Sequence, residues 1–168
     1  MARYLDLLVD LLLVRRLTPW SGNIGKRLVR SPKVYVRDSG LVHALLKVGT
    51  SEDLLGHPVA GPSWEGMVIE SLTAAAGEAP ATFYRTAAGA EVDLVFEGPG
   101  RKRYAVEVKR STVPIVTRGF WTGCADIKAT ESIVTYLGDD PIPLGGRVQT
   151  LGLRDAMAWV CERVGGDG

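Results

Sequence analysis

The sequence has too few cysteines and histidines to build a zinc site. Its 168 residues hold two of each, and Cys124, Cys161, His43 and His57 are scattered rather than grouped at metal-ligand spacing. Long apolar runs are missing too: no stretch reaches the roughly 18 consecutive apolar residues of a membrane span, and no signal peptide is recognisable. We therefore expect a cytoplasmic protein with reduced thiols and no membrane partner.

A nucleotide-binding loop is also missing. The glycine-containing run Ser21-Gly-Asn-Ile-Gly-Lys26 lacks the spacing of a Walker A motif, so ATP is not an expected cofactor. What remains is the composition of a soluble globular protein, with 46% hydrophobic and 23% charged residues and a length that suits one domain.

The net charge of +1 hides an uneven distribution. Residues 1–37 carry eight Lys or Arg against two Asp, a net +6, so the rest of the chain carries −5. A basic segment next to an acidic body suits a polyanion-binding edge beside a metal-binding pocket. The residues expected to bind nucleic acid are Arg15, Arg16, Lys26, Arg27, Arg30 and Lys33. A solvated basic loop, or a surface that meets an acidic partner domain, explains the same composition.

Apolar periodicity predicts helices alternating with strands over most of the chain. The first expected helix, Arg3–Arg16, is apolar almost all round and therefore needs partners on more than one side. Residues 20–32 form a connector rich in Gly, Ser and Arg, and 50–62 have the composition of a loop. Further helices are expected at 41–47, 63–76, 120–128 and 153–164, and strands at 33–37, 82–85, 91–96, 104–109 and 132–137. This order predicts an α/β domain with a mixed sheet and helices on both faces.

Two charged triplets, Glu91-Val-Asp93 and Glu107-Val-Lys109, flank a segment rich in turn-forming residues. In strands, each triplet places its charges on one face and its valine on the other. A hairpin folded about Gly100 sets Asp93 opposite Glu107 and Glu91 opposite Lys109, and Cβ atoms of such neighbours lie roughly 4.5–5.5 Å apart. Asp93 and Glu107 are then able to share one hard cation, and Lys109 to orient or deprotonate a water. The alternative is an exposed hairpin face joined by cross-strand salt bridges.

The helix predicted to begin at Ser63 adds a third carboxylate. At about 100° per residue, Glu65 falls near the middle of the apolar arc, whereas Glu70 points the other way and is expected to be solvated. An inward carboxylate is costly unless it is paired or binds a metal, so Glu65 joins the candidate site. The alternative is that Glu65, in the first turn, only complements the helix dipole at a solvated end. Gly77 is the expected stop of this helix.

Together these residues resemble the restriction-endonuclease-like superfamily of PD-(D/E)XK nucleases. Its helical acid, strand acid and acidic-x-Lys motif correspond to Glu65, Asp93 and Glu107-Val-Lys109. A wider set of motifs resembles the C-terminal domain of unknown function of prokaryotic AAA-type ATPases, over about residues 4–137. These motifs are Lys33-Val-Tyr35, Asp38-Ser-Gly-Leu41, Trp64-Glu65-Gly, Tyr84-Arg85 and the two charged triplets.

The resemblance implies a restriction-endonuclease-like domain at residues 33–168, with a mixed β-sheet flanked by helices. It also implies that residues 1–32, an N-terminal helix and basic connector, are left from a winged-helix-like linker region upstream. The expected partners are nucleic acid, above all DNA, and an AAA-type ATPase domain that this sequence does not contain.

The activity that the resemblance implies is metal-dependent phosphodiester hydrolysis, which would make the chain a hydrolase. Asp93 and Glu107 would hold Mg²⁺ or Mn²⁺, with Glu65 as a direct or water-mediated ligand. Lys109 would position or activate the attacking water. Around them, Arg85 would meet a phosphate and Glu91 would pair with Lys109.

Two non-catalytic alternatives use the same sequence. One is a nucleic-acid-binding or regulatory module that partners an AAA-type ATPase, since a fold does not fix a function. The other is a protein-interaction domain whose leucine-rich first helix packs on that ATPase or on a second copy of the chain. Cleavage that disappears with Asp93→Ala would separate the enzyme from both.

Overall fold

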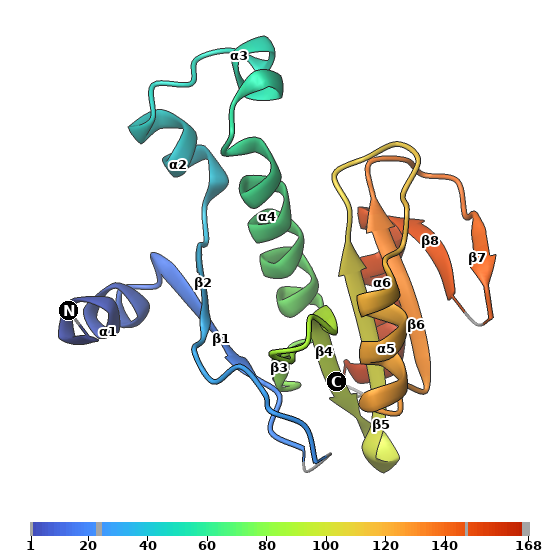
Figure 1. The fold of residues 1–168 in the computed structure, drawn as a ribbon. Coiled ribbons are helices and arrows are strands. Elements are labelled where there is room, and N and C mark those ends of the chain that lie inside the picture. Colours follow the sequence, from blue (N-terminus) through green and yellow to red (C-terminus); the bar gives the residue numbers. More distant parts are fainter. Residues whose placement is uncertain (1, 23–24, 147, 166–168) are drawn as a thin grey trace.

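A mixed β-sheet runs through the whole molecule in the computed structural model, which describes residues 2–22, 25–146 and 148–165 (Figure 1). Within those residues, eight strands follow the order β2-β1-β3-β4-β5-β6-β8-β7. The strands are β1 (Val14–Pro19), β2 (Lys33–Val36), β3 (Ala81–Arg85), β4 (Glu91–Gly98), β5 (Lys102–Val108), β6 (Glu131–Tyr136), β7 (Pro143–Gly145) and β8 (Val148–Gly152). The helices are α1 (Ala2–Asp10), α2 (Ser39–Leu45), α3 (Ser51–Gly56), α4 (Ala60–Ala75), α5 (Arg118–Asp126) and α6 (Leu153–Val164).

The sheet combines antiparallel and parallel pairs. Strands β3, β4 and β5 form an antiparallel meander, whereas β5, β6 and β8 run parallel to one another. At one edge, β1 pairs parallel to β3 and antiparallel to β2. Parallel neighbours need crossover connections, and α5 and the β7 segment supply them between β5, β6 and β8.

Helices cover both faces of the sheet (Figure 1). On one face, α4 and α6 contribute Val68, Ile69, Leu72 and Val160 to a core that also contains Phe96. On the other face, α5 contributes Phe120 to a second apolar cluster. The expected α/β class, a mixed sheet flanked by helices, is therefore confirmed. Within the described ranges, no helix combines the length and the apolar character that crossing a membrane requires.

The N-terminal segment differs from the prediction. Helix α1 ends at Asp10 rather than Arg16, because the backbone at Leu12 leaves the helical region with φ 58° and the following residues join the sheet. In β1, Val14 and Leu17 are buried, which a strand edge provides and a longer helix would not. The division of the chain after residue 32 stays a prediction; β1 lies before that boundary and is hydrogen-bonded to β3 beyond it.

Other helix and strand boundaries also differ from the prediction. Helix α4 begins at Ala60, three residues before the expected cap Ser63, whose hydroxyl instead lies 2.7 Å from Nε2 of His43. Gly77, with φ 62°, ends the helix as expected. Three short elements were not predicted: α3 inside the expected loop 50–62, the edge strand β7, and β8, which lies between β6 and β7.

Glu70 on α4 is not solvated, contrary to the prediction. The β1–β2 hairpin lies against this face of the helix, and Glu70 Oε1 accepts hydrogen bonds from Arg15 at 3.0 Å and Arg37 at 2.6 Å. Burial alone would raise the pKa of Glu70, but its hydrogen bonds to the two arginines outweigh burial and hold the pKa below the usual 4.5. Two ion pairs thus fasten the hairpin to α4.

This triad predicts a specific acid sensitivity. A carboxyl whose pKa is lowered by folding contributes stability above its ordinary pKa, and that contribution is lost as pH falls through the folded value. Glu70→Gln is expected to lower the free energy of unfolding at pH 7 and to flatten its decline between about pH 5 and pH 3. Urea unfolding across that range would measure it, with exposed Glu78→Gln as the matched control. Equal pH profiles in wild type and Glu70→Gln would contradict the proposed linkage.

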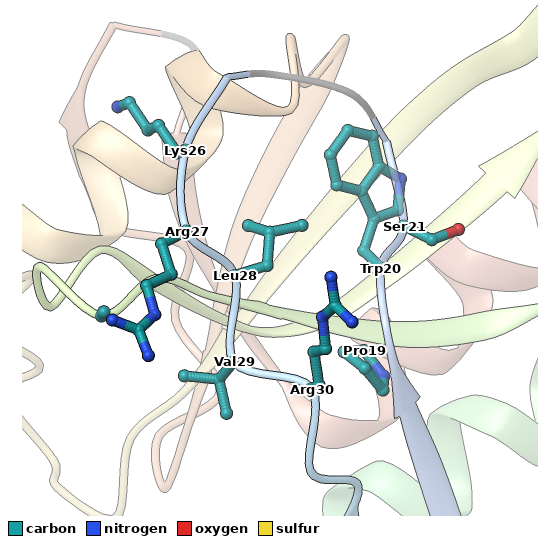
Figure 2. A pocket seen from close by; sticks show the side chains of 9 residues that line it. Pro19, Trp20, Ser21, Lys26, Arg27, Leu28, Val29 and Arg30 are labelled. Carbon is teal, nitrogen blue, oxygen red and sulfur yellow. The ribbon is translucent and has the colours of Figure 1, made fainter.

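An open pocket of about 1000 Å³ lies beside the connector between β1 and β2, and Figure 2 shows Arg27 and Arg30 among the side chains that line it. Both arginines are exposed, whereas Lys26 pairs with Asp126 on α5 at 2.5 Å. Nucleic-acid binding by Arg27 and Arg30 therefore stays a prediction that the geometry allows.

Candidate active site

The β4–β5 hairpin has the predicted register. The ladder runs from Leu94 opposite Val106 to Gly98 opposite Lys102, and the turn contains Gly100 with φ 70°. Beyond Leu94, a side chain links the two strands in place of backbone hydrogen bonds. The Asp93 Oδ2 accepts a hydrogen bond from the backbone N–H of Val108 at 3.1 Å. This hydrogen bond holds the Asp93 carboxylate against β5, the strand that also carries Glu107.

Glu107 is a buried carboxylate with one oxygen in use. Its Oε1 accepts a hydrogen bond from Lys109 Nζ at 2.6 Å, while Oε2 is buried without a hydrogen-bond partner in the described part of the chain. Burial, together with the nearby charge of Asp93, raises the pKa of Glu107 to about 7, and the contact with Lys109 offsets this only in part. The charge of Asp93 therefore acts on Glu107, while the predicted sharing of a cation by these two carboxylates stays a prediction.

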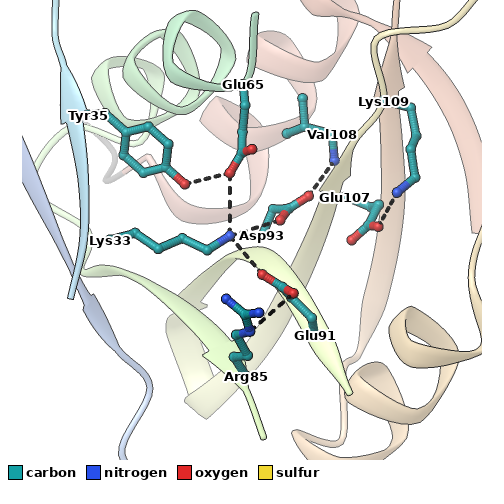
Figure 3. Close-up of polar contacts among 9 residues, drawn as sticks. All are labelled: Lys33, Tyr35, Glu65, Arg85, Glu91, Asp93, Glu107, Val108 and Lys109. Carbon is teal, nitrogen blue, oxygen red and sulfur yellow. Dashed lines mark hydrogen bonds and ion pairs between the residues drawn. The ribbon is translucent and has the colours of Figure 1, made fainter. Parts of the chain in front are cut away.

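Lys33 lies at the centre of the other carboxylates (Figure 3). From β2 at the sheet edge, its Nζ reaches Glu91 Oε1 at 2.9 Å, Asp93 Oδ1 at 3.1 Å and Glu65 Oε1 at 3.4 Å. Burial lowers the pKa of Lys33, but the charges of Asp93 and Glu65 outweigh it and hold the pKa above its ordinary value. Lys33 was predicted to bind nucleic acid; in the structure its ammonium is engaged inside the site.

Tyr35 completes this side of the cluster. It lies on the same face of β2 as Lys33, and its hydroxyl donates to Glu65 Oε1 at 2.6 Å. Burial and the hydrogen bond to Glu65 raise the pKa of Tyr35, so it remains a neutral donor. Tyr35 was not among the predicted site residues, although the alternation of Lys33-Val-Tyr35 places it on the same face as Lys33.

The other residues predicted to surround the site are Arg85, Glu91 and the basic residues of the N-terminal segment. Arg85 contacts Glu91 at 3.5 Å, so these two residues lie together at the edge of the site. The expected pair of Glu91 with Lys109 was wrong: Glu91 pairs with Lys33 and Arg85, because the strands have parted by this point and Lys109 reaches Glu107 instead. Besides Lys26 and Lys33, two more of the residues expected to bind nucleic acid form ion pairs, Arg15 with Glu70 and Arg16 with Asp6.

Asp93 and Glu107 are the two carboxylates whose chemistry suits a hard divalent cation. Asp93 and Glu107 supply the oxygen ligands that Mg²⁺ and Mn²⁺ prefer, and the unpartnered Oε2 of Glu107 is a buried acceptor with unused capacity. Glu65 is occupied by Tyr35 and Lys33. Across the described ranges, no three His, Cys, Asp or Glu side chains lie close enough together to hold a metal ion.

Comparison with known proteins places most of this site within one family. Residues 60–155, more than half of the chain, match the family described as Domain of unknown function (DUF4143). The chain belongs to this family. The DUF4143 match contains Glu65, Asp93, Glu107 and Lys109, whereas Lys33 and Tyr35 fall in residues 1–52, which match Domain of unknown function (DUF8612).

Two longer proteins resemble this DUF4143 chain. An uncharacterized protein of Mycobacterium bovis and one of Mycobacterium tuberculosis are each 43% identical to it over 146 residues, which cover 87% of the chain. The matched part is 33% of each relative, so the chain spans about a third of the length of the curated relatives it matches. No solved structure matches the chain.

Proposed function

We propose that this chain is a metal-dependent nuclease-like domain that hydrolyses phosphodiesters, of the restriction-endonuclease-like PD-(D/E)XK type. The observation that carries the proposal is the buried, unpartnered Oε2 of Glu107 beside Asp93, with the Lys109 ammonium 2.6 Å from the other Glu107 oxygen. Burying a charged oxygen without a partner is costly, and such costs concentrate at functional sites.

In this proposal, Asp93 and Glu107 hold one Mg²⁺ or Mn²⁺ ion. When bound, that ion would polarise a phosphoryl oxygen and lower the pKa of a coordinated water. The chain's own residues do the rest: Val108 N–H fixes the rotamer of Asp93, and Lys109 holds Glu107 and presents a positive charge to the reacting phosphate. Arg85, half-exposed beside Glu91, is placed to meet a neighbouring phosphate.

The exposed basic residues support nucleic acid as the proposed substrate. Arg27 and Arg30 are exposed along the connector pocket in Figure 2 and would contact the phosphate backbone of nucleic acid, with DNA as the expected class. An AAA-type ATPase is the expected protein partner, in keeping with the resemblance described above. The expected salt dependence of binding is strong, because phosphate contacts release counterions.

A second candidate function is a non-catalytic module that binds a protein partner. It is favoured by α1 and the residues after it, where Leu7, Leu11 and Leu12 are 52%, 58% and 67% exposed. Apolar surface of this kind commonly marks an interaction site. In this alternative, Lys33 neutralises the carboxylates permanently and the site has only a structural role.

The deciding experiment is a Mn²⁺ titration by calorimetry on wild type and on Asp93→Ala, with folding checked by circular dichroism. The nuclease proposal expects wild-type binding that Asp93→Ala abolishes, accompanied by Mn²⁺-dependent cleavage of DNA that the same substitution abolishes. Binding without cleavage of any single- or double-stranded nucleic acid would favour the non-catalytic module. No binding by folded wild type would reject the metal site.

A further inference from the structure

Lys33 contributes a fixed positive charge to one side of the carboxylate cluster. Its ammonium contacts three carboxylates that come from two elements, Glu65 on α4 and Glu91 and Asp93 on β4. The side chain is 19% exposed, and its Nζ also lies 5.5 Å from the centre of the Phe83 ring. A lysine held by so many partners is part of the built site rather than a mobile surface charge.

We propose that Lys33 is a resident internal cation that excludes a second metal ion and restricts the site to one divalent ion between Asp93 and Glu107. This inference rests on the proposed function for the location of that one ion. The second part of the inference is that Lys33 excludes metal ions from the cluster of Glu65, Glu91 and Asp93. This part depends only on the contacts of Lys33.

The arrangement of oxygens separates the two positions. Lys33 contacts Oδ1 of Asp93, whereas Oδ2 faces β5 and the backbone N–H of Val108. Glu107 lies on the far side of Asp93 from Lys33, paired with Lys109 (Figure 3). A divalent ion beside Glu107 Oε2 therefore does not compete with Lys33 for the same oxygens.

Distances explain why the Lys33 cluster does not bind a metal ion as it stands. The three oxygens surround Nζ at 2.9–3.4 Å, the spacing of an ammonium ion. Divalent ions need oxygens closer, at roughly 2.0–2.1 Å for Mg²⁺ and 2.3–2.6 Å for Ca²⁺. With the ammonium removed, the negative charges of the three carboxylates are left unbalanced, which favours the entry of a divalent ion.

The test counts Mn²⁺ ions per chain by equilibrium dialysis in wild type and Lys33→Met, which keeps an unbranched apolar side chain and removes the charge. We expect Lys33→Met to bind one ion more than wild type. Lys33→Arg retains a positive charge and is expected to match wild type, as is Lys47→Met, which changes an exposed lysine elsewhere. Equal counts in Lys33→Met and wild type would overturn the inference.

Folding of the variant is a second readout. Three carboxylates without their ammonium repel one another, so Lys33→Met is expected to melt at a lower temperature than wild type in chelator and to regain most of the loss in Mn²⁺. A variant that stays unfolded or unchanged in Mn²⁺ would also overturn the inference. The two proposals fail separately: wild type that binds no ion rejects the Asp93–Glu107 site, whereas the extra ion in Lys33→Met tests Lys33 alone.

Discussion

Replacing Lys109 by methionine is expected to slow metal-dependent phosphodiester cleavage by roughly a hundredfold or more while leaving Mn²⁺ binding in place. The Lys109 ammonium lies 2.6 Å from Glu107 Oε1, next to the oxygen that has no partner, so it is the cation best placed to act on a water or phosphate there. Methionine keeps an unbranched apolar side chain, one atom shorter than lysine, but removes the proton donor and the charge. The loss should therefore appear in the rate of the chemical step.

The measurement is single-turnover cleavage of plasmid and single-stranded DNA, with Mn²⁺ affinity determined in parallel by calorimetry. Lys102→Met at the exposed far end of β5 is the matched control and should behave as wild type. If Lys109→Met loses Mn²⁺ binding as completely as Asp93→Ala, then Lys109 only supports the metal ligands. Unchanged cleavage would remove Lys109 from the mechanism.

Replacing Glu107 by glutamine is expected to stabilise the metal-free protein at alkaline pH, although it abolishes Mn²⁺ binding. Burial raises the pKa of Glu107 from 4.5 to about 7, so the folded state favours the protonated carboxyl. The stability associated with Glu107 is therefore fully present below about pH 4.5 and is lost as pH rises through 7. A shift of this size corresponds to about 3 kcal/mol, which neutral glutamine would retain.

Urea unfolding in chelator between pH 5 and pH 9 would measure this effect. The free energy of unfolding of wild type should decline across the range relative to that of Glu107→Gln, and the two profiles should converge near pH 5. Exposed Glu78→Gln serves as the control and should follow wild type. Parallel profiles for wild type and Glu107→Gln would show that Glu107 is already ionised at little cost.

The sequence predicted the part of the site that forms locally. The register of β4 and β5 followed from alternating charges and a turn at Gly100, because a two-residue period admits few pairings once one face must be buried. Helix α6, Leu153–Val164, was also predicted with its observed bounds, since its apolar spacing persists over three turns. Both features depend on neighbours close in the chain.

The features that were missed depend on contacts between distant segments. Lys33 and Asp93 are 60 residues apart, and contacts between distant segments, among them the pairing of β1 with β3, bring them together. For the same reason Glu70 was assigned to solvent, because the helical period of α4 does not reveal that Arg15 and Arg37 cover it. Short strands such as β7 carry too few residues to show a period.

The short ladder between β1 and β3 suggests an order in which the strands pair during folding. That parallel ladder consists of Thr18 with Thr82 and Pro19 with Phe83, and it joins segments more than sixty residues apart. The β4–β5 hairpin closes a much shorter loop, so we expect it to pair sooner in folding than β1 pairs with β3. Transient detachment of the β1–β2 edge in the finished protein would reverse the last step of folding: it would withdraw Lys33 and leave the two carboxylates in place.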